Sequence, residues 1–189
     1  MGDNMDKLRL YNVQDEYINY LRKFDHKVFS NKEDDRKFGR KYLGVVLNVA
    51  GFNYFVPLSS PKNSDFIIKN GLRIIRKNTI PIIRIVAEDV DGNPELKGTL
   101  KFSNMIPIHP NALIDYDVYT EKDEDYKILI TKEIDFISKN KVGILKNAKV
   151  IYNQKTKGYN INYLNNTVDF KLLETKCSEY NKNTNNESI

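Results

Sequence analysis

Apolar residues in the first half of the chain form short runs separated by turn residues, a pattern typical of β-strands. Residues 42–47 and 53–58 are the clearest pair, and Ala50-Gly51 between them favours a tight turn because glycine tolerates a positive φ. Two shorter runs, residues 72–75 and 82–86, predict further strands. This half of the chain therefore predicts a sheet made of consecutive strands.

Prolines and glycines mark where these strands end. Asp91-Gly92 followed by Asn93-Pro94 predicts a turn. Residues 99–108 have a mixed, strand-like pattern that Pro107 and Pro110 interrupt, since proline cannot donate to a ladder of backbone hydrogen bonds.

Helical periodicity dominates the last third of the chain. Residues 126–137, 144–152 and 169–180 carry apolar side chains every three or four positions, as do residues 15–24 near the start, where Asp15 is the expected N-cap. Strands followed by helices, without alternation of the two, predict an α+β fold with an antiparallel sheet and packed α-helices.

The length of 189 residues suits one domain, which we expect in residues 1–180, followed by a polar, disordered tail in residues 181–189. A single cysteine, Cys177, excludes a disulfide framework within the chain and favours a reducing compartment. Residues 1–10 mix charged and apolar side chains, unlike a signal peptide, and no apolar run approaches the roughly 20 residues that span a bilayer. We therefore expect a soluble, cytoplasmic protein.

The net charge of +5 is modest, but its distribution is uneven. Residues 137–168 contain six lysines and no acid, and residues 60–87 contain six basic residues against Asp65 alone, whereas acids gather in residues 115–125. Segregated charge favours a face that meets a polyanion such as RNA. The alternative is an ordinary solvated surface, and charge alone leaves both open.

The familiar catalytic motifs are missing. His26 and His109 stand alone rather than at metal-ligand spacing, and there is no phosphate-binding glycine loop or nucleophile elbow. The two histidines are better interpreted as structural or surface residues, and the acids of residues 115–125 as a solvated loop rather than a metal site. We therefore expect no metal or other cofactor.

One segment could carry chemistry. Residues 57–62 read Pro-Leu-Ser-Ser-Pro-Lys and follow directly after a hydrophobic strand. A sheet holds the start of such a loop in place and leaves its end exposed. Hydroxyl groups and backbone N–H groups can bind a phosphate, and a lysine can neutralise charge on it. The alternative is an ordinary Ser-Pro turn.

The same segment resembles the signature of the ToxN/AbiQ family, in which a hairpin that begins at a glycine continues into Pro-Leu-Thr/Ser-Ser-Pro-Lys. Residues 44–47, Gly51 and residues 54–62 fit that pattern. Tyr11, Tyr17, Tyr20-Leu21 and residues 24–28 resemble the N-terminal helix of the family. Residues 101–102, 105–108 and 170–174 resemble later segments, so that the resemblance covers about residues 10–180.

The resemblance implies a compact, strongly twisted sheet with a barrel core like that of the MazF and Kid toxins. It implies an endoribonuclease toxin that needs no metal and leaves a 2′,3′-cyclic phosphate and a 5′-hydroxyl. It also implies inhibition by a repeated RNA pseudoknot, which the toxin processes and with which it forms a closed assembly. Cellular or phage RNA would be the substrate, with a role in abortive phage infection.

Five residues are expected at the catalytic site on the strength of this resemblance. Ser60 and Lys62 match the serine and lysine of the family, and Ser59 stands where some members have threonine. Tyr17 matches a tyrosine of the N-terminal helix. Arg40 matches the basic residue before the hairpin, with Lys41 as a close rival. A further site tyrosine has no match, because residues 31–39 contain none.

The basic residues expected to contact RNA come from several segments: Lys27, Lys41, Lys69, Arg73, Arg76, Lys139, Lys141, Lys146 and Lys149. Two other hypotheses remain open. The chain could be a non-catalytic module that binds single-stranded RNA through lysines and its twelve tyrosines, or a scaffold domain with no affinity for RNA.

Overall fold

The computed structural model describes residues 8–31 and 38–184, with side chains up to residue 180. Within these residues, strands of one antiparallel sheet follow the order β6-β7-β3-β2-β1-β9, and β8 pairs with β3. The strands are β1 (Arg9–Val13), β2 (Tyr42–Val49), β3 (Phe52–Ser59), β6 (Ile82–Glu88), β7 (Pro94–Lys101), β8 (Ile106–Pro107) and β9 (Leu113–Asp115). Strands β4 (Phe66–Lys69) and β5 (Leu72–Ile75) form a separate hairpin.

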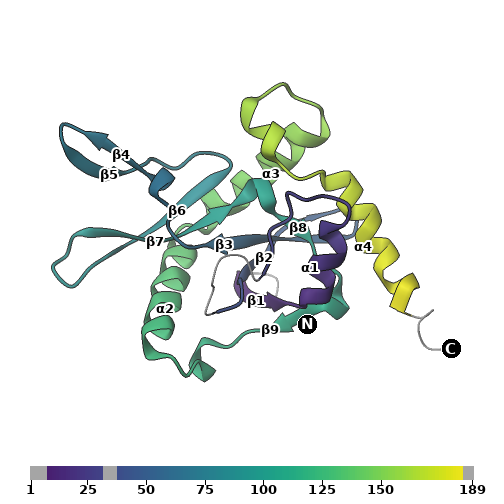
Figure 1. Cartoon of the computed structure of the whole chain (residues 1–189), viewed down its shortest axis with the longest axis horizontal. Coiled ribbons are helices and arrows are strands. Elements are labelled where there is room, and N and C mark those ends of the chain that lie inside the picture. Colours follow the sequence, from purple (N-terminus) through teal and green to yellow (C-terminus); the bar gives the residue numbers. More distant parts are fainter. Residues whose placement is uncertain (1–7, 32–37, 185–189) are drawn as a thin grey trace.

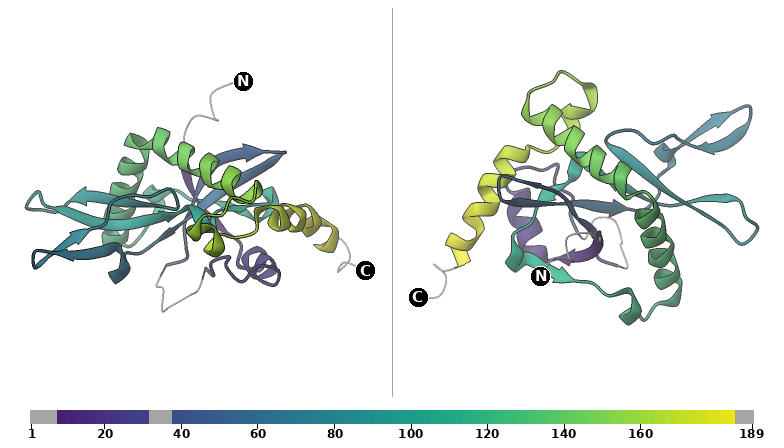
Figure 2. Two further views of the ribbon diagram at one scale, coloured as in Figure 1. Left: turned by 90° about the horizontal axis from the view of Figure 1, so that it is seen from above. Right: turned by 180° about the vertical axis from the view of Figure 1, so that it is seen from behind.

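Four helices surround this sheet in the described part of the chain: α1 (Asp15–Arg22), α2 (Glu124–Lys139), α3 (Lys141–Thr156) and α4 (Phe170–Thr184). Helix α2 packs on β6 and β7, α3 packs on β2, and α4 packs on β8, α3 and α1. The β4–β5 and β6–β7 hairpins project from the same end of the molecule, away from α1 and α4 (Figures 1 and 2). Every helix of the described residues is too short or too polar to span a bilayer.

The predicted α+β class with an antiparallel sheet is confirmed, but the expected barrel is not. A barrel needs its two edge strands to pair, and within the described residues β6 and β9 lie at opposite ends of the strand order without pairing. The sheet therefore stays open. The predicted tail overlaps the end of α4, which runs to residue 184, and its remainder, residues 185–189, lies outside the described residues.

Many predicted elements occur within a few residues of their expected bounds, but the strand-like stretch of residues 99–108 does not form one strand. It contains the end of β7, which begins at Pro94, a 3-10 helix at Phe102–Asn104, and β8. Helix α1 begins at Asp15, but its N-cap is Gln14, without a side-chain bond to the helix. The carboxylate of Asp15 instead accepts a hydrogen bond from Asn31 Nδ2 at 3.0 Å. The strands β1, β4 and β9 were not predicted, because each is short and only β1 carries buried apolar residues, Leu10 and Val13.

The predicted turns are confirmed by their backbone angles. Ala50 and Gly51 have φ values of 51° and 84° between β2 and β3, and Gly92 has a φ of 81° between β6 and β7. Glycine accepts this left-handed region without steric cost. These turns set the pairing of β2 with β3 and of β6 with β7, and so determine where β3 ends.

Gly44 on β2 allows the closest packing in the sheet. A Cβ atom at residue 44 would lie 2.0 Å from the Cδ1 atom of Phe55. The ring of Phe55 cannot move aside easily, because it is buried and makes an edge contact with Tyr11 at 5.5 Å between centroids. The glycine at this point in the motif therefore serves packing rather than chemistry.

We predict that Gly44→Ala lowers the free energy of unfolding by about 1–3 kcal/mol, because the added methyl group overpacks a well-filled core. Urea unfolding measures the effect. Gly143→Ala is the matched control: Gly143 lies on α3 with nothing near its virtual Cβ, so alanine there should stabilise the protein by about 0.5–1 kcal/mol. Equal stability of Gly44→Ala and wild type would contradict this packing argument.

Candidate active site

The end of β3 carries the two serines singled out by the sequence. Ser59 is the last strand residue and is buried, whereas Ser60 and Lys62 are exposed in the loop that follows. Two cavities of about 150 Å³ and 530 Å³ flank this point. Arg40, Ser59 and Ser60 line both cavities. The loop therefore separates two hollows into which a ligand could extend on either side of Ser60.

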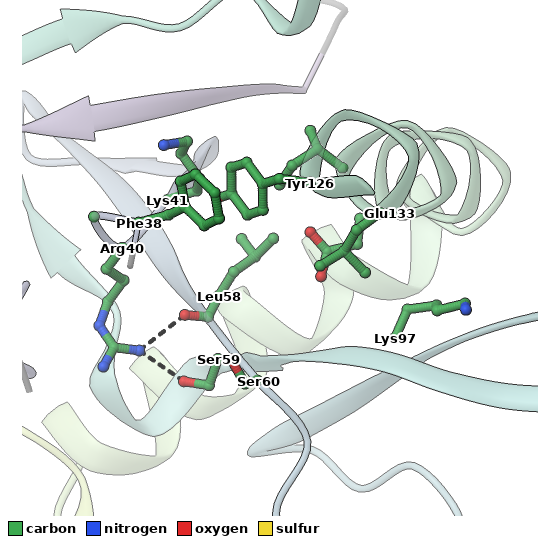
Figure 3. Close-up of a pocket in the computed structure, with 12 residues that line it drawn as sticks. Phe38, Arg40, Lys41, Leu58, Ser59, Ser60, Lys97, Tyr126 and Glu133 are labelled. Carbon is green, nitrogen blue, oxygen red and sulfur yellow. Dashed lines mark hydrogen bonds between the residues drawn. The ribbon is translucent and has the colours of Figure 1, made fainter. Parts of the chain in front are cut away.

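Arg40 fixes the end of the strand from the side (Figure 3). Its Nη1 donates to the carbonyl oxygen of Leu58 and to Ser59 Oγ, each at 2.8 Å, and its Nε donates to the carbonyl oxygen of Ser30 at 3.1 Å. The guanidinium also lies 4.6 Å from the ring centroid of Phe29. Arg40 is therefore a rigid, buried cation, and the structure places it at the loop as the sequence predicted.

Asp65 anchors the other end of the loop. This carboxylate is almost completely buried, and its Oδ2 accepts the backbone N–H of Lys62 at 3.0 Å. Its Oδ1 pairs with Arg84 at 3.1 Å and lies 3.8 Å from the Nζ atom of Lys101. Because the backbone of Lys62 is tied to a buried ion pair, the Ser60–Lys62 segment has a defined path.

The larger cavity is strongly cationic. Arg40, Lys62 and Lys101 line it, and no Asp or Glu is among the described residues that do. Burial lowers the pKa of Lys101; the nearby Asp65 opposes this, while the charges of Arg84 and Lys62 add to it. A ligand that brings negative charge would relieve this repulsion between cations, as a phosphate group would.

The smaller cavity combines aromatic and ionisable side chains. Phe38 and Tyr126 stack face to face with their ring centroids 3.9 Å apart. The Nζ atom of Lys41 lies 4.3 Å from the ring centroid of Tyr116, and burial lowers the pKa of Lys41. Arg40 and Lys41, the two candidates for the basic residue before the hairpin, thus both lie at the site. Arg40 bonds to Ser59, and Lys41 lines the cavity.

Glu133 on α2 is a site residue that the sequence did not reveal. Its side chain points into the smaller cavity (Figure 3), and burial raises the pKa of its carboxyl group to about 8. The carboxyl fits there because residue 98 is glycine: a Cβ at Gly98 would lie 2.3 Å from Glu133 Oε1 and 3.4 Å from the carbonyl oxygen of Ser59.

Tyr17, expected at the site, lies elsewhere. Its side chain is completely buried, its hydroxyl donates to the carbonyl oxygen of Pro107 at 2.8 Å, and its ring packs 4.8 Å from that of Tyr180. It lines neither cavity beside Ser60, and burial raises the pKa of its hydroxyl. The structure therefore does not bring Tyr17 together with the serines and lysines.

The basic residues expected to contact RNA fall into three places. Lys27 donates to the carbonyl oxygen of Thr167 at 3.3 Å, and Lys41 lies inside the site. The β4–β5 hairpin and the short segment after it expose Lys69, Arg73 and Arg76. The end of α2 and helix α3 carry Lys139, Lys146 and Lys149, which are exposed, and Lys141, which is half-buried.

Two expectations about charge need correction. Lys139 does have a carboxylate partner, since its Nζ atom lies 2.7 Å from Asp135 Oδ2 one helical turn away. Arg84, counted in the basic stretch of residues 60–87, is buried in its ion pair with Asp65 and does not contribute to a basic surface.

The residues that sequence reasoning missed carried recognisable signals. Asp65 is the only acid in a basic stretch, which is where a buried counter-ion would stand. Glu133 lies three residues after Ile130 and four before Ile137, on the apolar face of its helix. Within the described residues no group of three or more His, Cys, Asp or Glu side chains is arranged to hold a metal ion.

Comparison with known proteins identifies relatives over nearly the whole chain. The family model described as "Toxin ToxN, type III toxin-antitoxin system" matches residues 9–178. The endoribonuclease AbiQ of Lactococcus lactis subsp. lactis is 33% identical over 175 residues, which cover 93% of this chain and 90% of AbiQ. The endoribonuclease ToxN of Bacillus thuringiensis subsp. kurstaki is 28% identical and covers 94% of this chain and 86% of that protein.

Solved structures match with the same coverage. A structure of AbiQ, described as a lactococcal anti-phage endoribonuclease, superposes with a TM-score of 0.74 at 30% identity, covering 93% of this chain and 99% of that one. A structure described in terms of selective toxin inhibition by a non-coding RNA pseudoknot superposes with a TM-score of 0.72 at 29% identity, with the same coverage of both chains.

The loop anchor generates a prediction about stability. Asp65→Ala should lower the free energy of unfolding by about 3–5 kcal/mol, because it leaves Arg84 as a buried charge without its partner. Urea unfolding measures this loss. The double variant Asp65→Leu/Arg84→Met removes both charges and should recover most of the stability. A single variant as stable as wild type would show that the ion pair does not hold this region.

Proposed function

The chain belongs to the ToxN family of type III toxin–antitoxin toxins, and from this premise we propose how it acts. It is an endoribonuclease whose active site is the Ser59–Lys62 loop, and a structured RNA antitoxin is its inhibitor. The observation that supports the site most directly is the position of Ser60, exposed between two cavities and beside a buried arginine.

The proposed reaction uses the 2′-hydroxyl of the RNA as its nucleophile. This oxygen attacks the adjacent phosphorus atom in line with the P–O5′ bond, giving a 2′,3′-cyclic phosphate and a 5′-hydroxyl, so no nucleophile or metal ion is required from the protein. The protein contributes by holding the phosphate in that geometry, which lowers the entropic part of the barrier.

Charge on the reacting phosphate is relieved by cations, of which Arg40 is fixed by its hydrogen bonds to Leu58 and Ser59. Arg40, Lys62 and Lys101 line the larger cavity, and preorganised charges stabilise a transition state without the cost of reorienting solvent. The hydroxyl of Ser60 would donate a hydrogen bond to a phosphate oxygen. Ser59, whose oxygen accepts from Arg40, would contribute by keeping the guanidinium in place.

The smaller cavity would receive the nucleotide next to the cleaved bond. The stacked rings of Phe38 and Tyr126 offer the kind of aromatic surface on which proteins stack unpaired RNA bases. In this proposal Tyr126 takes the place of the site tyrosine that has no match in residues 31–39. The buried Tyr17 has a structural role, because its hydroxyl is already engaged with Pro107.

We further propose that the antitoxin is a repeated RNA pseudoknot, processed by this protein and bound in a closed assembly. Structures described in terms of toxin inhibition by an RNA pseudoknot and of a processed regulatory RNA support the pseudoknot and its processing. The likeness to AbiQ supports a role in aborting phage infection, with cellular or phage RNA as the substrate in the cytoplasm. We also propose that the twisted antiparallel sheet of this protein is related to the sheet at the core of the MazF and Kid toxins.

The Ser60 assignment predicts that Ser60→Ala reduces cleavage of a short RNA about 10²–10³-fold, as the loss of one donor to a developing charge commonly does, and abolishes toxicity without altering the fold. Single-turnover cleavage in EDTA measures the rate. Ser64→Ala is the matched control, because Ser64 is exposed in the same loop but lines neither cavity.

Three results would count against these ideas. A well-expressed Ser60→Ala protein that stays toxic would remove Ser60 from the site. Binding of RNA by the wild type without any cyclic-phosphate product would favour the non-catalytic RNA-binding module. Absence of salt-dependent RNA affinity would favour the scaffold hypothesis.

The basic residues at the end of α2 and on α3 generate a prediction about inhibition. Replacing Lys139, Lys141, Lys146 and Lys149 by Gln should weaken antitoxin binding more than it slows cleavage of a short oligonucleotide, because a folded RNA presents phosphates over a wider surface. The salt slope of antitoxin binding should also become shallower, by up to about 0.9 for each phosphate that the variant no longer neutralises. Affinity titrations at several salt concentrations measure both.

A second variant identifies the alternative surface. Replacing Lys69, Arg73, Arg76 and Lys77 by Gln removes the same number of charges from the β4–β5 hairpin and the segment after it. If the α3 variant binds the antitoxin with unchanged affinity and salt slope while the hairpin variant shows a reduction in both, the antitoxin occupies the hairpin face instead.

A further inference from the structure

Glu133 is an acidic side chain in a site otherwise made of cations and hydroxyls. It projects from α2 across Gly98 of β7 toward the end of β3, and it shares the smaller cavity with Arg40, Ser59 and Ser60. Only 5% of the residue is exposed to solvent, and its side chain is one of those that line the cavity (Figure 3).

The carboxyl group has no hydrogen-bond or ion-pair partner among the described residues. Lys97 of β7 lines the same cavity but pairs with Glu95, and Arg40 bonds to Leu58, Ser59 and Ser30. A buried carboxylate without a partner is costly, so this group is held in its protonated form and keeps an O–H available for donation.

The surroundings of Glu133 agree with this state. Beside residues 118–120, which pack on α2, the Tyr116 hydroxyl interacts with Glu133 but stays neutral, because burial raises its pKa to about 12. From the segment before β2, Lys41 lies over the Tyr116 ring. On β6, Arg84 is committed to Asp65, and no basic residue of α3 lines the cavity. Tyr126 on α2 is stacked on Phe38. The pKa of the carboxyl, raised to about 8 by burial, therefore reflects desolvation rather than a charged neighbour.

We propose that Glu133 is the general acid of the cleavage reaction. This inference rests on the proposed function. As the 2′-oxygen forms its bond to phosphorus and gives up its proton to water, the P–O5′ bond breaks, and the electron pair of that bond takes the proton of Glu133. The leaving group departs as a 5′-hydroxyl, and the carboxylate regains its proton from solvent.

The position and chemistry of the group suit that step. A general acid works best when its pKa lies near the working pH and it is still protonated there. Arg40, Ser59 and Ser60 line both cavities, whereas Lys62 and Lys101 line only the larger one and Glu133 only the smaller one. A strand that passes over Ser60 could therefore place its phosphate beside Arg40 and its leaving oxygen toward Glu133. Gly98 leaves room for the carboxyl in this position, since a Cβ there would lie 2.3 Å from Glu133 Oε1.

The test compares two RNA substrates, one with the natural 5′-oxygen and one with a bridging 5′-sulfur at the scissile bond. A thiolate leaves without protonation because its pKa is far below that of an alcohol. Glu133→Gln should reduce cleavage of the oxygen substrate by about 100-fold or more and leave cleavage of the sulfur substrate within a few-fold of wild type. Glu124→Gln is the matched control, exposed on the same helix and paired with Lys127.

The pH dependence of the wild type gives an independent readout, which decides the matter even if the Gln variant fails to fold. Cleavage of the oxygen substrate should fall as the pH rises through about 8, because the acid loses its proton, and the sulfur substrate should lack this decline. The proposal would be overturned if Glu133→Gln slowed cleavage of both substrates equally, or did not slow cleavage of the oxygen substrate. It would also be overturned if the cleavage rate of the wild type fell in the same way with pH for both substrates. A wild type that cleaves neither substrate would overturn the proposed function itself.

Discussion

The ion pair between Asp65 and Arg84 is the constraint on which the candidate site depends. Its carboxylate accepts the backbone N–H of Lys62, so the loop after β3 begins at a buried strand end and returns to a buried charge. Arg40 holds the strand end from the opposite side. Without both anchors, the exposed serine and lysine would belong to a freely moving Ser-Pro turn with no fixed relation to the cavities.

The central hairpin of the sheet was predictable because its signals are local. Alternating apolar runs and the Ala50-Gly51 turn specify β2 and β3 without reference to the rest of the chain. The short strands β1 and β9 were missed because long-range pairing defines them rather than their own composition: β1 pairs with β2 and with β9. The absence of barrel closure in the described residues likewise depends on the order of strands that are far apart in the sequence. The pattern of apolar and polar residues does not determine that order.

The candidate site was predictable only where a contiguous motif describes it. Ser59, Ser60 and Lys62 lie within six residues, and Arg40 was found by counting back from Gly44. Glu133 and Gly98 meet the serines only through the packing of α2 on β7, which no spacing in the sequence records. Tyr17 shows the opposite case. It lies on the N-terminal helix, as its motif predicts, but its side chain is buried in the core rather than at the site.

The distance in sequence between the parts of this site has a consequence for synthesis of the protein. Arg40, Ser59, Gly98 and Glu133 come from four separate segments: the residues before β2, then β3, β7 and α2. A chain still emerging from the ribosome cannot enclose the smaller cavity until residues well past 133 have cleared the exit tunnel. A chain that ends before α2 would lack one wall of this cavity, so under the proposed function RNA cleavage would begin only after α2 has packed on β7.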